Sequence, residues 1–149
     1  MIGSADSSEV LLTLDERMTR KRHIVKLPAK TAKAVEEGLK QLRKEYGKTW
    51  PKVFHTITCD NGSEFASLSK LFTDTKIYYA HPYSAWERGT NEKQNSLIRR
   101  FFPKGKSFTS VSEETISLVE GWINNLPRKF LHYLSPDEVF HSVLFDLAI

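Results

Sequence analysis

The sequence predicts a single α/β domain in which helices cover both faces of a mixed sheet. Short β-branched and apolar runs alternate along the chain with segments whose apolar residues recur every three or four positions, which is the order of strands and crossover helices. The length of 149 residues suits one domain with a proper core. Hydrophobic residues make up 40% and charged residues 27% of the chain, a globular rather than a disordered balance.

Local signals place each element. Two apolar runs on either side of a polar stretch are typical of a hairpin, and Asp15, within that stretch, is predicted to be a turn residue. Thr31 and Gly47 are suitable ends for an amphipathic helix, and Ser135 begins a capping box with Pro136 in the first turn. The expected elements are strands over 10–14 and 24–27, a helix over 32–46, a strand over 54–59, a short helix over 65–72, a strand over 76–80, and helices over 90–102, 112–124 and from 135 onward.

Charge and composition argue against a membrane or secreted protein and favour one that binds nucleic acid. No apolar run approaches the roughly 20 residues that span a bilayer, residues 1–9 do not resemble a secretory signal, and the single Cys59 fits a reducing compartment. The net charge is +4 and the pI about 9.2. Residues 86–106 contain six basic and two acidic side chains, an excess equal to that of the whole chain. Such a local basic strip favours binding to phosphate backbones.

Two carboxylates stand out as candidate metal ligands. Asp60 follows a predicted strand in an Asp-Asn-Gly sequence, at the strand end where α/β folds place their chemistry. Glu92 shares a predicted helix face with Arg88 and Arg99, opposite apolar residues of 97–102. Carboxylates on separate elements beside a basic strip suit divalent ions at a phosphodiester. Taken singly, Asp-Asn-Gly is typical of a plain turn and a helix-surface Glu of a solvated side chain, so neither residue establishes a function.

The order of these residues resembles the second half of the DDE motif of integrase-core transposases. Residues 60–65 read Asp-Asn-Gly-Ser-Glu-Phe, and residues 80–92 read Ala-His-Pro-Tyr-Ser-Ala-Trp-Glu-Arg-Gly-Thr-Asn-Glu. This is most similar to the insertion-sequence-thirty transposases, whose pattern is Asp-Asn-Gly-x-Glu-Phe, a strand, and His-Pro-Tyr-Ser-x-Trp-Glu-Arg-Gly-x-Asn-Glu. The resemblance continues through 97–105, 124–129 and 135–140, and it spans nearly the whole chain.

The resemblance implies a ribonuclease-H-like fold with extra C-terminal helices, and DDE-type polynucleotidyl transferase activity. It implies that Asp60 is the second metal-binding acid and Glu92 the third, with two Mg²⁺ or Mn²⁺ ions in the complete enzyme. Glu87 is an alternative for the third acid, but it aligns with the loop before the helix. The residues expected to contact DNA are Trp86, Arg88, Asn91, Lys93, Arg99, Arg100 and Lys104.

The first acid of the motif is expected to precede Met1. Family members carry an Asp a few residues before an Ile-Gly that resembles Ile2-Gly3, and neither Asp6 nor Asp15 fits that pattern. We therefore expect a truncated first strand, two of three metal ligands, and no N-terminal DNA-recognition domain within 1–149. A chain of this kind is predicted to be inactive by itself in strand transfer.

The resulting expectation is one domain, 1–149, forming the catalytic core of a bacterial DNA transposase or integrase. It would act as a homo-oligomer on element ends and target DNA, in the cytoplasm at the nucleoid, with no membrane partner. The alternative from another class is a non-catalytic DNA-binding or assembly module of a decayed or truncated transposase. A nuclease of the same fold acting on RNA–DNA hybrids is a further alternative, which the Trp-Glu-Arg-Gly-x-Asn-Glu stretch disfavours.

Overall fold

The computed structural model describes residues 1–4, 7–81 and 89–148, with only the backbone described for 89–91 and 148. Its N-terminal part is an antiparallel ladder in the order β1-β2-β3, formed by β1 (Ile2–Gly3), β2 (Val10–Asp15) and β3 (Arg22–Leu27). The β2–β3 pairing runs from Val10 opposite Leu27 to Asp15 opposite Arg22. The predicted hairpin is confirmed.

A second, parallel pair joins β4 (Thr56–Cys59) to β5 (Lys76–Tyr79). The crossover contains the 3-10 helix η2 (Ser63–Phe65) and α3 (Leu68–Leu71), where the sequence predicted one continuous helix. The Asn61 side-chain amide donates to the carbonyl of Ala80 at 2.7 Å, so the two strand ends are tied together where the crossover begins and ends.

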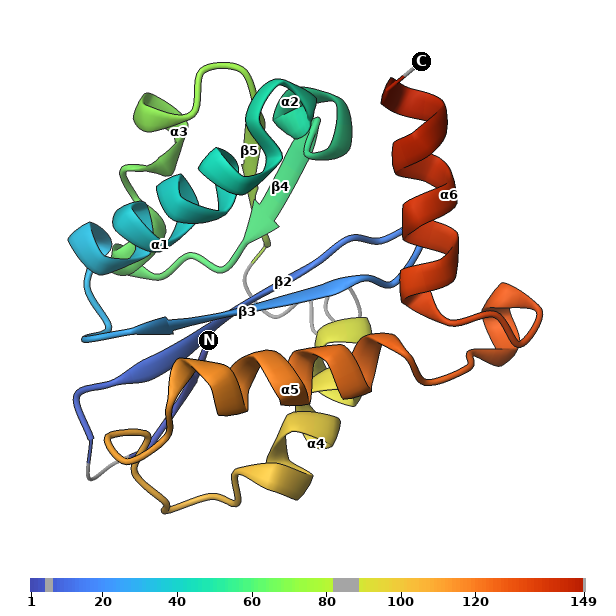
Figure 1. Cartoon of the computed structure of the whole chain (residues 1–149). Helices are drawn as coiled ribbons and strands as arrows, with labels where there is room; N and C mark the ends of the chain where they lie inside the picture. Colours follow the sequence, from blue (N-terminus) through green and yellow to red (C-terminus); the bar gives the residue numbers. More distant parts are fainter. Residues whose placement is uncertain (5–6, 82–88, 149) are drawn as a thin grey trace.

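Helices lie on both sides of the β2–β3 ladder (Figure 1), as expected for a mixed α/β arrangement. On one side lies α1 (Ala32–Tyr46), and on the other lie α4 (Gly89–Phe101) and α5 (Glu113–Asn124). Strand alternation explains the two layers, because successive side chains point to opposite faces. Val10 and Leu12 enter the core beneath α1, and Leu11 enters the core shared with α4 and α5.

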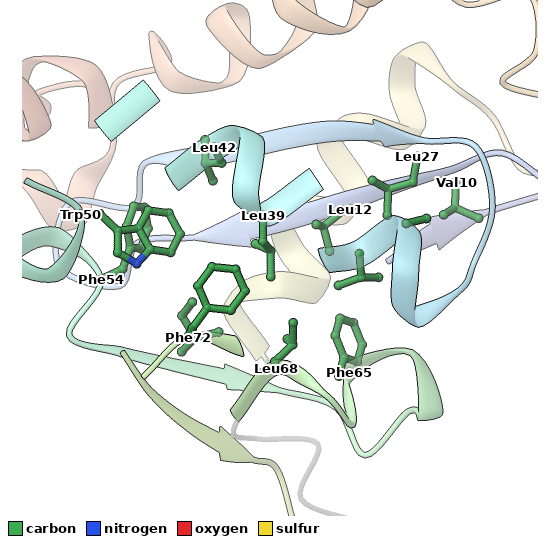
Figure 2. Close-up of a cluster of buried hydrophobic side chains, with 13 residues drawn as sticks. Val10, Leu12, Leu27, Leu39, Leu42, Trp50, Phe54, Phe65, Leu68 and Phe72 are labelled. Atoms are coloured by element: carbon green, nitrogen blue, oxygen red, sulfur yellow. The ribbon is translucent and has the colours of Figure 1, made fainter. Parts of the chain in front are cut away.

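The larger core joins α1 to the β4–β5 unit (Figure 2). Leu39 and Leu42 of α1 face the aromatic side chains of Trp50 and Phe72. Trp50, fully buried, also donates its indole N–H to the Thr75 hydroxyl at 2.9 Å. It begins α2 (Trp50–Val53), which follows the 3-10 helix η1 (Gly47–Thr49). Neither segment was predicted from the sequence.

The C-terminal part follows the predicted boundaries closely. The Ser112 hydroxyl accepts from the Thr115 N–H at 3.1 Å and caps α5. After η4 (Lys129–Leu131), the helix α6 (Pro136–Ala148) begins with the expected capping box, in which Ser135 N–H donates to Glu138 at 2.7 Å. No helix in the part of the chain that the structure describes is long and apolar enough to cross a membrane.

Two predictions on individual residues are wrong. Asp15 is not a turn residue, because it ends β2 with a side chain only 5% exposed, paired with Arg22. Phe101, one of the apolar residues of 97–102 expected on the buried face opposite Glu92, does not belong to that face of α4, since it is 43% exposed and packs edge-to-face on Trp122. The buried face instead carries Gln94, Ile98 and, just after the helix, Phe102.

Candidate active site

Asp60 lies at the end of β4, as the sequence predicted. The Ala80 N–H donates to the Cys59 carbonyl at 2.8 Å, which extends the parallel pairing to the residue before Asp60. Together with the Asn61 bond to Ala80, this fixes the backbone on both sides of the carboxylate.

Glu92 lies in the first turn of α4 with an exposed side chain. Asp60 and Glu92 line the same cavity, of about 160 Å³, together with Asn95 one turn further along α4. Met1 and Leu14 also line it, so that the cavity lies between β1, β2, the end of β4 and the start of α4. The structure thus brings together the two carboxylates that the sequence singled out.

The carboxylates of Asp60 and Glu92 are the right type of ligand for a hard divalent ion, but two carboxylates are too few to hold it. Carboxylate oxygens are the ligands that Mg²⁺ and Mn²⁺ prefer. Among residues 1–4, 7–81 and 89–148, no group of three His, Cys, Asp or Glu side chains could hold a metal ion. Burial lowers the pKa of the Met1 amino group at this cavity, while the charge of Asp60 acts to raise it.

Cys59, the residue before Asp60, also lines this cavity. Burial, with a smaller contribution from Asp60, raises the pKa of the Cys59 thiol to about 11. The thiol remains protonated at neutral pH, and its hydrogen-bond partner is the carbonyl of Tyr78 at 3.6 Å. Cys59 therefore lines the cavity as a neutral side chain rather than as a nucleophile or a thiolate ligand.

A buried polar network supports the helix that carries Glu92. Arg22 is fully buried and donates through Nε and Nη2 to the two oxygens of Asp15, each at 2.6 Å. Its Nη1 donates to Asn95 of α4 at 2.9 Å. Asn124 of α5 bonds the Arg22 backbone on both sides, accepting from its N–H and donating to its carbonyl, each at 2.8 Å. The β3 end is thereby joined to both helices.

Asn95, Arg22 and Asn124 were not predicted from the sequence as support for the site. Asn95 was detectable, since it follows Glu92 by three residues and must lie on the same helix face. The Asn124 side chain, in contrast, forms two hydrogen bonds with the backbone of Arg22 in β3, as a neighbouring strand would, although it lies 102 residues away in the sequence. No local pattern encodes such a pairing.

The residues expected to bind DNA separate into several groups. Arg99 is engaged within the fold, because its Nη2 donates to the Gly3 carbonyl of β1 at 3.0 Å. Lys93, Arg100 and Lys104 are exposed. The side chains of Trp86, Arg88 and Asn91, like the rival Glu87, lie outside the described residues.

This fold is that of an integrase catalytic core. The chain is similar to the catalytic core domain of BIV integrase, with a TM-score of 0.68 at 18% identity, covering 99% of this chain and 93% of that one. It is also similar to a chain of the simian T-cell lymphotropic virus intasome in complex with PP2A regulatory subunit B56 gamma, with a TM-score of 0.53 at 15% identity over 85% and 52% of the two chains. The ribonuclease-H-like class predicted from the sequence is confirmed.

Within that class, the chain is similar in sequence to transposases of insertion sequence elements, including those of the IS30 type. It is 41% identical over 137 residues to the transposase for insertion sequence element IS4351 of Bacteroides fragilis, covering 90% of this chain and 40% of the relative. It is 32% identical over 138 residues to the transposase InsI for insertion sequence element IS30A of Escherichia coli (strain K12), covering 91% and 35%. The chain thus spans well under half the length of these relatives. No family model matches it.

Proposed function

We propose that this chain is the catalytic core of a DNA transposase that cuts and rejoins DNA with divalent metal ions. The observation that carries the proposal is the convergence of Asp60 and Glu92 on one cavity, from a strand end and a helix start. Similarity to transposases of insertion elements supports DNA as the substrate. Element ends and target DNA are the two substrates of such a reaction.

In this proposal Asp60 and Glu92 hold Mg²⁺ or Mn²⁺, and a third carboxylate comes from an Asp in the segment before β1 of a longer transposase. Met1 lines the cavity, so a residue just before it would be close to both acids. Bound ions offset negative charge on the attacking and leaving oxygens of phosphoryl transfer. With two of three ligands, residues 1–149 by themselves would bind metal weakly and be inactive in strand transfer.

The remaining residues of the site would position Glu92 or bind the negatively charged DNA backbone. Asn95, held by Arg22, fixes the first turns of α4 and so the approach of Glu92 to Asp60. Exposed Lys93, Arg100 and Lys104 would contact phosphates and position the DNA without reading its sequence. Trp86, Arg88 and Asn91 stay proposed DNA contacts from the resemblance. We further propose that the active complex is a homo-oligomer and that it acts at the bacterial nucleoid.

A non-catalytic DNA-binding module is the second candidate. The observation that favours it is the lack of a three-carboxylate cluster among the described residues. Under this alternative, the basic surface binds DNA while the carboxylates have no metal to hold.

The two candidates differ in metal binding and in DNA cleavage. In a transposase extended upstream of Met1 to include the expected Asp, we expect Mn²⁺-dependent nicking of a duplex carrying the element end. Asp60→Asn and Glu92→Gln should each abolish nicking and weaken Mn²⁺ binding measured by calorimetry. Asp74→Asn is the matched control, because Asp74 pairs with Arg43 at the surface and lies outside the cavity. Binding of DNA without nicking or Mn²⁺ uptake in the extended protein would establish the binding module instead.

A further inference from the structure

The loop between α5 and α6 presents two aromatic side chains to solvent. Phe130 and Tyr133 are each 69% exposed, and the neighbouring Leu134 is 48% exposed. The segment projects from the body of the protein near the start of α6 (Figure 1). Exposed apolar groups that gather at one place mark interaction sites more often than scattered ones do.

The loop is closed and conformationally strained. Its ends are joined by the Arg128 N–H donating to the Leu134 carbonyl at 3.0 Å and the Tyr133 N–H donating to the Arg128 carbonyl at 2.9 Å. His132 and Tyr133 have φ of 54° and 67°, in the left-handed region that non-glycine residues rarely occupy. Such strain tends to occur at functional sites. The two rings are therefore held outward by a preorganised backbone.

The surroundings of the rings are cationic. The Arg20 guanidinium at the tip of the β2–β3 hairpin lies 4.8 Å from the centroid of Phe130. Arg17 on the hairpin and Lys129 on the loop are exposed. The nearby acid Glu16 accepts from the Met18 and Thr19 N–H groups of the hairpin at 2.9 and 2.7 Å.

The other nearby acids are engaged as well. Asp137 forms an ion pair with Lys21 and accepts from the Asn125 amide at 3.3 Å. Glu138 accepts from the Ser135 N–H in the capping box. Glu138 keeps an exposed negative charge, but Arg20 against Phe130 and Lys129 next to it in the chain give the rings cationic neighbours, which are complementary to a phosphate backbone rather than to another apolar face.

This surface adjoins the candidate active site. The Arg20 carbonyl accepts from the buried Gln94 of α4 at 3.4 Å, and Glu92 lies two residues earlier, on the other side of the same helical turn. Leu14 lines the cavity, and Arg17 follows it by three residues into the hairpin turn, a span of at most roughly 10 Å. A nucleic-acid strand leaving the cavity past the start of α4 would reach the hairpin tip within a few nucleotides.

We propose that Phe130 and Tyr133, with Lys129 on the same loop and Arg17 on the adjoining hairpin, bind the unpaired bases and phosphates of a DNA strand that leaves the candidate active site. The proposal rests on the proposed function, since it takes DNA as the substrate. Aromatic side chains stack on bases of any sequence provided that the bases are unpaired. The surface would therefore select DNA with an open end over continuous duplex.

The test measures binding without cleavage. The 149-residue chain is titrated, in EDTA, onto a duplex with a single-stranded overhang that carries 2-aminopurine, and onto a blunt duplex of equal length. Phe130→Ser and Tyr133→Gly should each weaken overhang binding by roughly 5- to 100-fold and reduce quenching of 2-aminopurine, with little effect on the blunt duplex. Glycine readily adopts the backbone of Tyr133, so Tyr133→Gly should not lower the Tm. Phe145→Ser is the control, because Phe145 is equally exposed at 69% on α6.

The outcomes are separable. Unchanged overhang affinity in both variants overturns the proposal, as does an equal loss in Phe145→Ser. If the variants lose self-association in sedimentation while keeping DNA affinity, the surface binds another copy of the chain and the proposal is wrong. Asp60→Asn should keep overhang binding in EDTA. If the extended protein fails to nick DNA with metal but the chain still binds overhangs, the proposed function is rejected and this binding site is not. If nicking occurs but the Phe130 and Tyr133 variants bind overhangs normally, only this binding site is rejected.

Discussion

Arg22 and Asp15 form a buried ion pair with two parallel hydrogen bonds of 2.6 Å, and Arg22 is wholly inaccessible to solvent. The pair lies at the hairpin end of the β2–β3 ladder. The same guanidinium also donates a hydrogen bond to the Asn95 side chain of α4. A charged pair in this position links strand pairing to the orientation of the helix that carries Glu92.

We predict that Arg22→Met lowers the free energy of unfolding by about 3–5 kcal/mol, because it leaves the Asp15 carboxylate buried without its partner. Urea denaturation measures the change. Arg43→Met is the matched control: its pair with Asp74 has the same 2.6 Å length but is 40% and 32% exposed, so a loss below about 1 kcal/mol is expected. Equal losses in the two variants would contradict a structural role for the buried pair.

Asn95→Leu should show whether the hydrogen bond from Arg22 positions α4 for catalysis, apart from its contribution to overall stability. The variant keeps the Arg22–Asp15 pair and removes only the bond to the helix, for a loss of about 1–3 kcal/mol from the unsatisfied donor. In the extended protein we expect a larger loss of nicking than Ser96→Ala produces, since Ser96 is exposed and donates to the Lys93 carbonyl of its own helix. Nicking rates at saturating Mn²⁺ test this; equal rates would show that Asn95 does not position Glu92.

The stability of the protein should fall on acidification through His23. Burial lowers the pKa of His23 to about 3 from the usual 6.5, and its ring packs against Tyr46, Phe54 and Phe140. Below pH 6.5 the unfolded chain binds a proton that the folded chain does not, so the free energy of unfolding decreases as pH falls from 6.5 toward 3. Burial raises the pKa of Glu120, so the folded chain takes up a proton there more readily than the unfolded chain. In the acidic part of the range this uptake opposes the loss of unfolding free energy caused by His23.

His23→Gln should therefore flatten the dependence of unfolding free energy on pH between 6.5 and 5, where one such group contributes up to about 1.4 kcal/mol per pH unit. Denaturation curves across that range provide the measurement. His55→Gln, at an exposed position, should leave the slope unchanged. A slope that is as steep in His23→Gln as in the parent protein would show that His23 is not the group responsible.

Cys59 should react slowly with thiol reagents in the folded chain. A pKa of about 11 leaves only a small thiolate fraction at pH 8, and the thiolate is the reacting form. Reaction with 5,5′-dithiobis(2-nitrobenzoic acid) should be at least tenfold slower than in urea-unfolded protein. Asp60→Asn should speed the reaction of the folded chain modestly, because the Asp60 charge contributes to the raised pKa. Equal rates in folded and unfolded protein would contradict the burial of this thiol.

Two helix glycines should respond oppositely to alanine. A Cβ at Gly38 of α1 would lie 2.6 Å from Cδ2 of Leu27, a core residue that is 2% exposed, and 3.3 Å from Cγ1 of Val25. Gly38→Ala should therefore destabilise the fold by about 1–3 kcal/mol through overpacking. At Gly121 of α5 a Cβ meets nothing within 4 Å, so Gly121→Ala should stabilise by up to about 1 kcal/mol. Thermal denaturation of both variants measures the contrast, and a loss at Gly121 would refute it.

The sequence by itself determined most of the longer elements and the two carboxylates. Thr31, Ser112 and the capping box at Ser135 act within a few residues, so the starts of α1, α5 and α6 could be predicted from local chemistry. Asp60 at a strand end and Glu92 on a helix face were predictable for the same reason. The family resemblance supplied the ribonuclease-H-like class and the roles that we propose for these two residues.

Only the tertiary structure decided how these pieces are held together. Asp15 looked like a turn residue because a polar stretch follows it, yet its partner Arg22 lies across the ladder and is buried by α4 and α5. Asn124 bonds a strand 102 residues earlier, and Phe130 is held outward by a loop whose closure depends on left-handed backbone at Tyr133. Burial and pairing between distant segments arise from packing of whole elements, and no local pattern of residues encodes them.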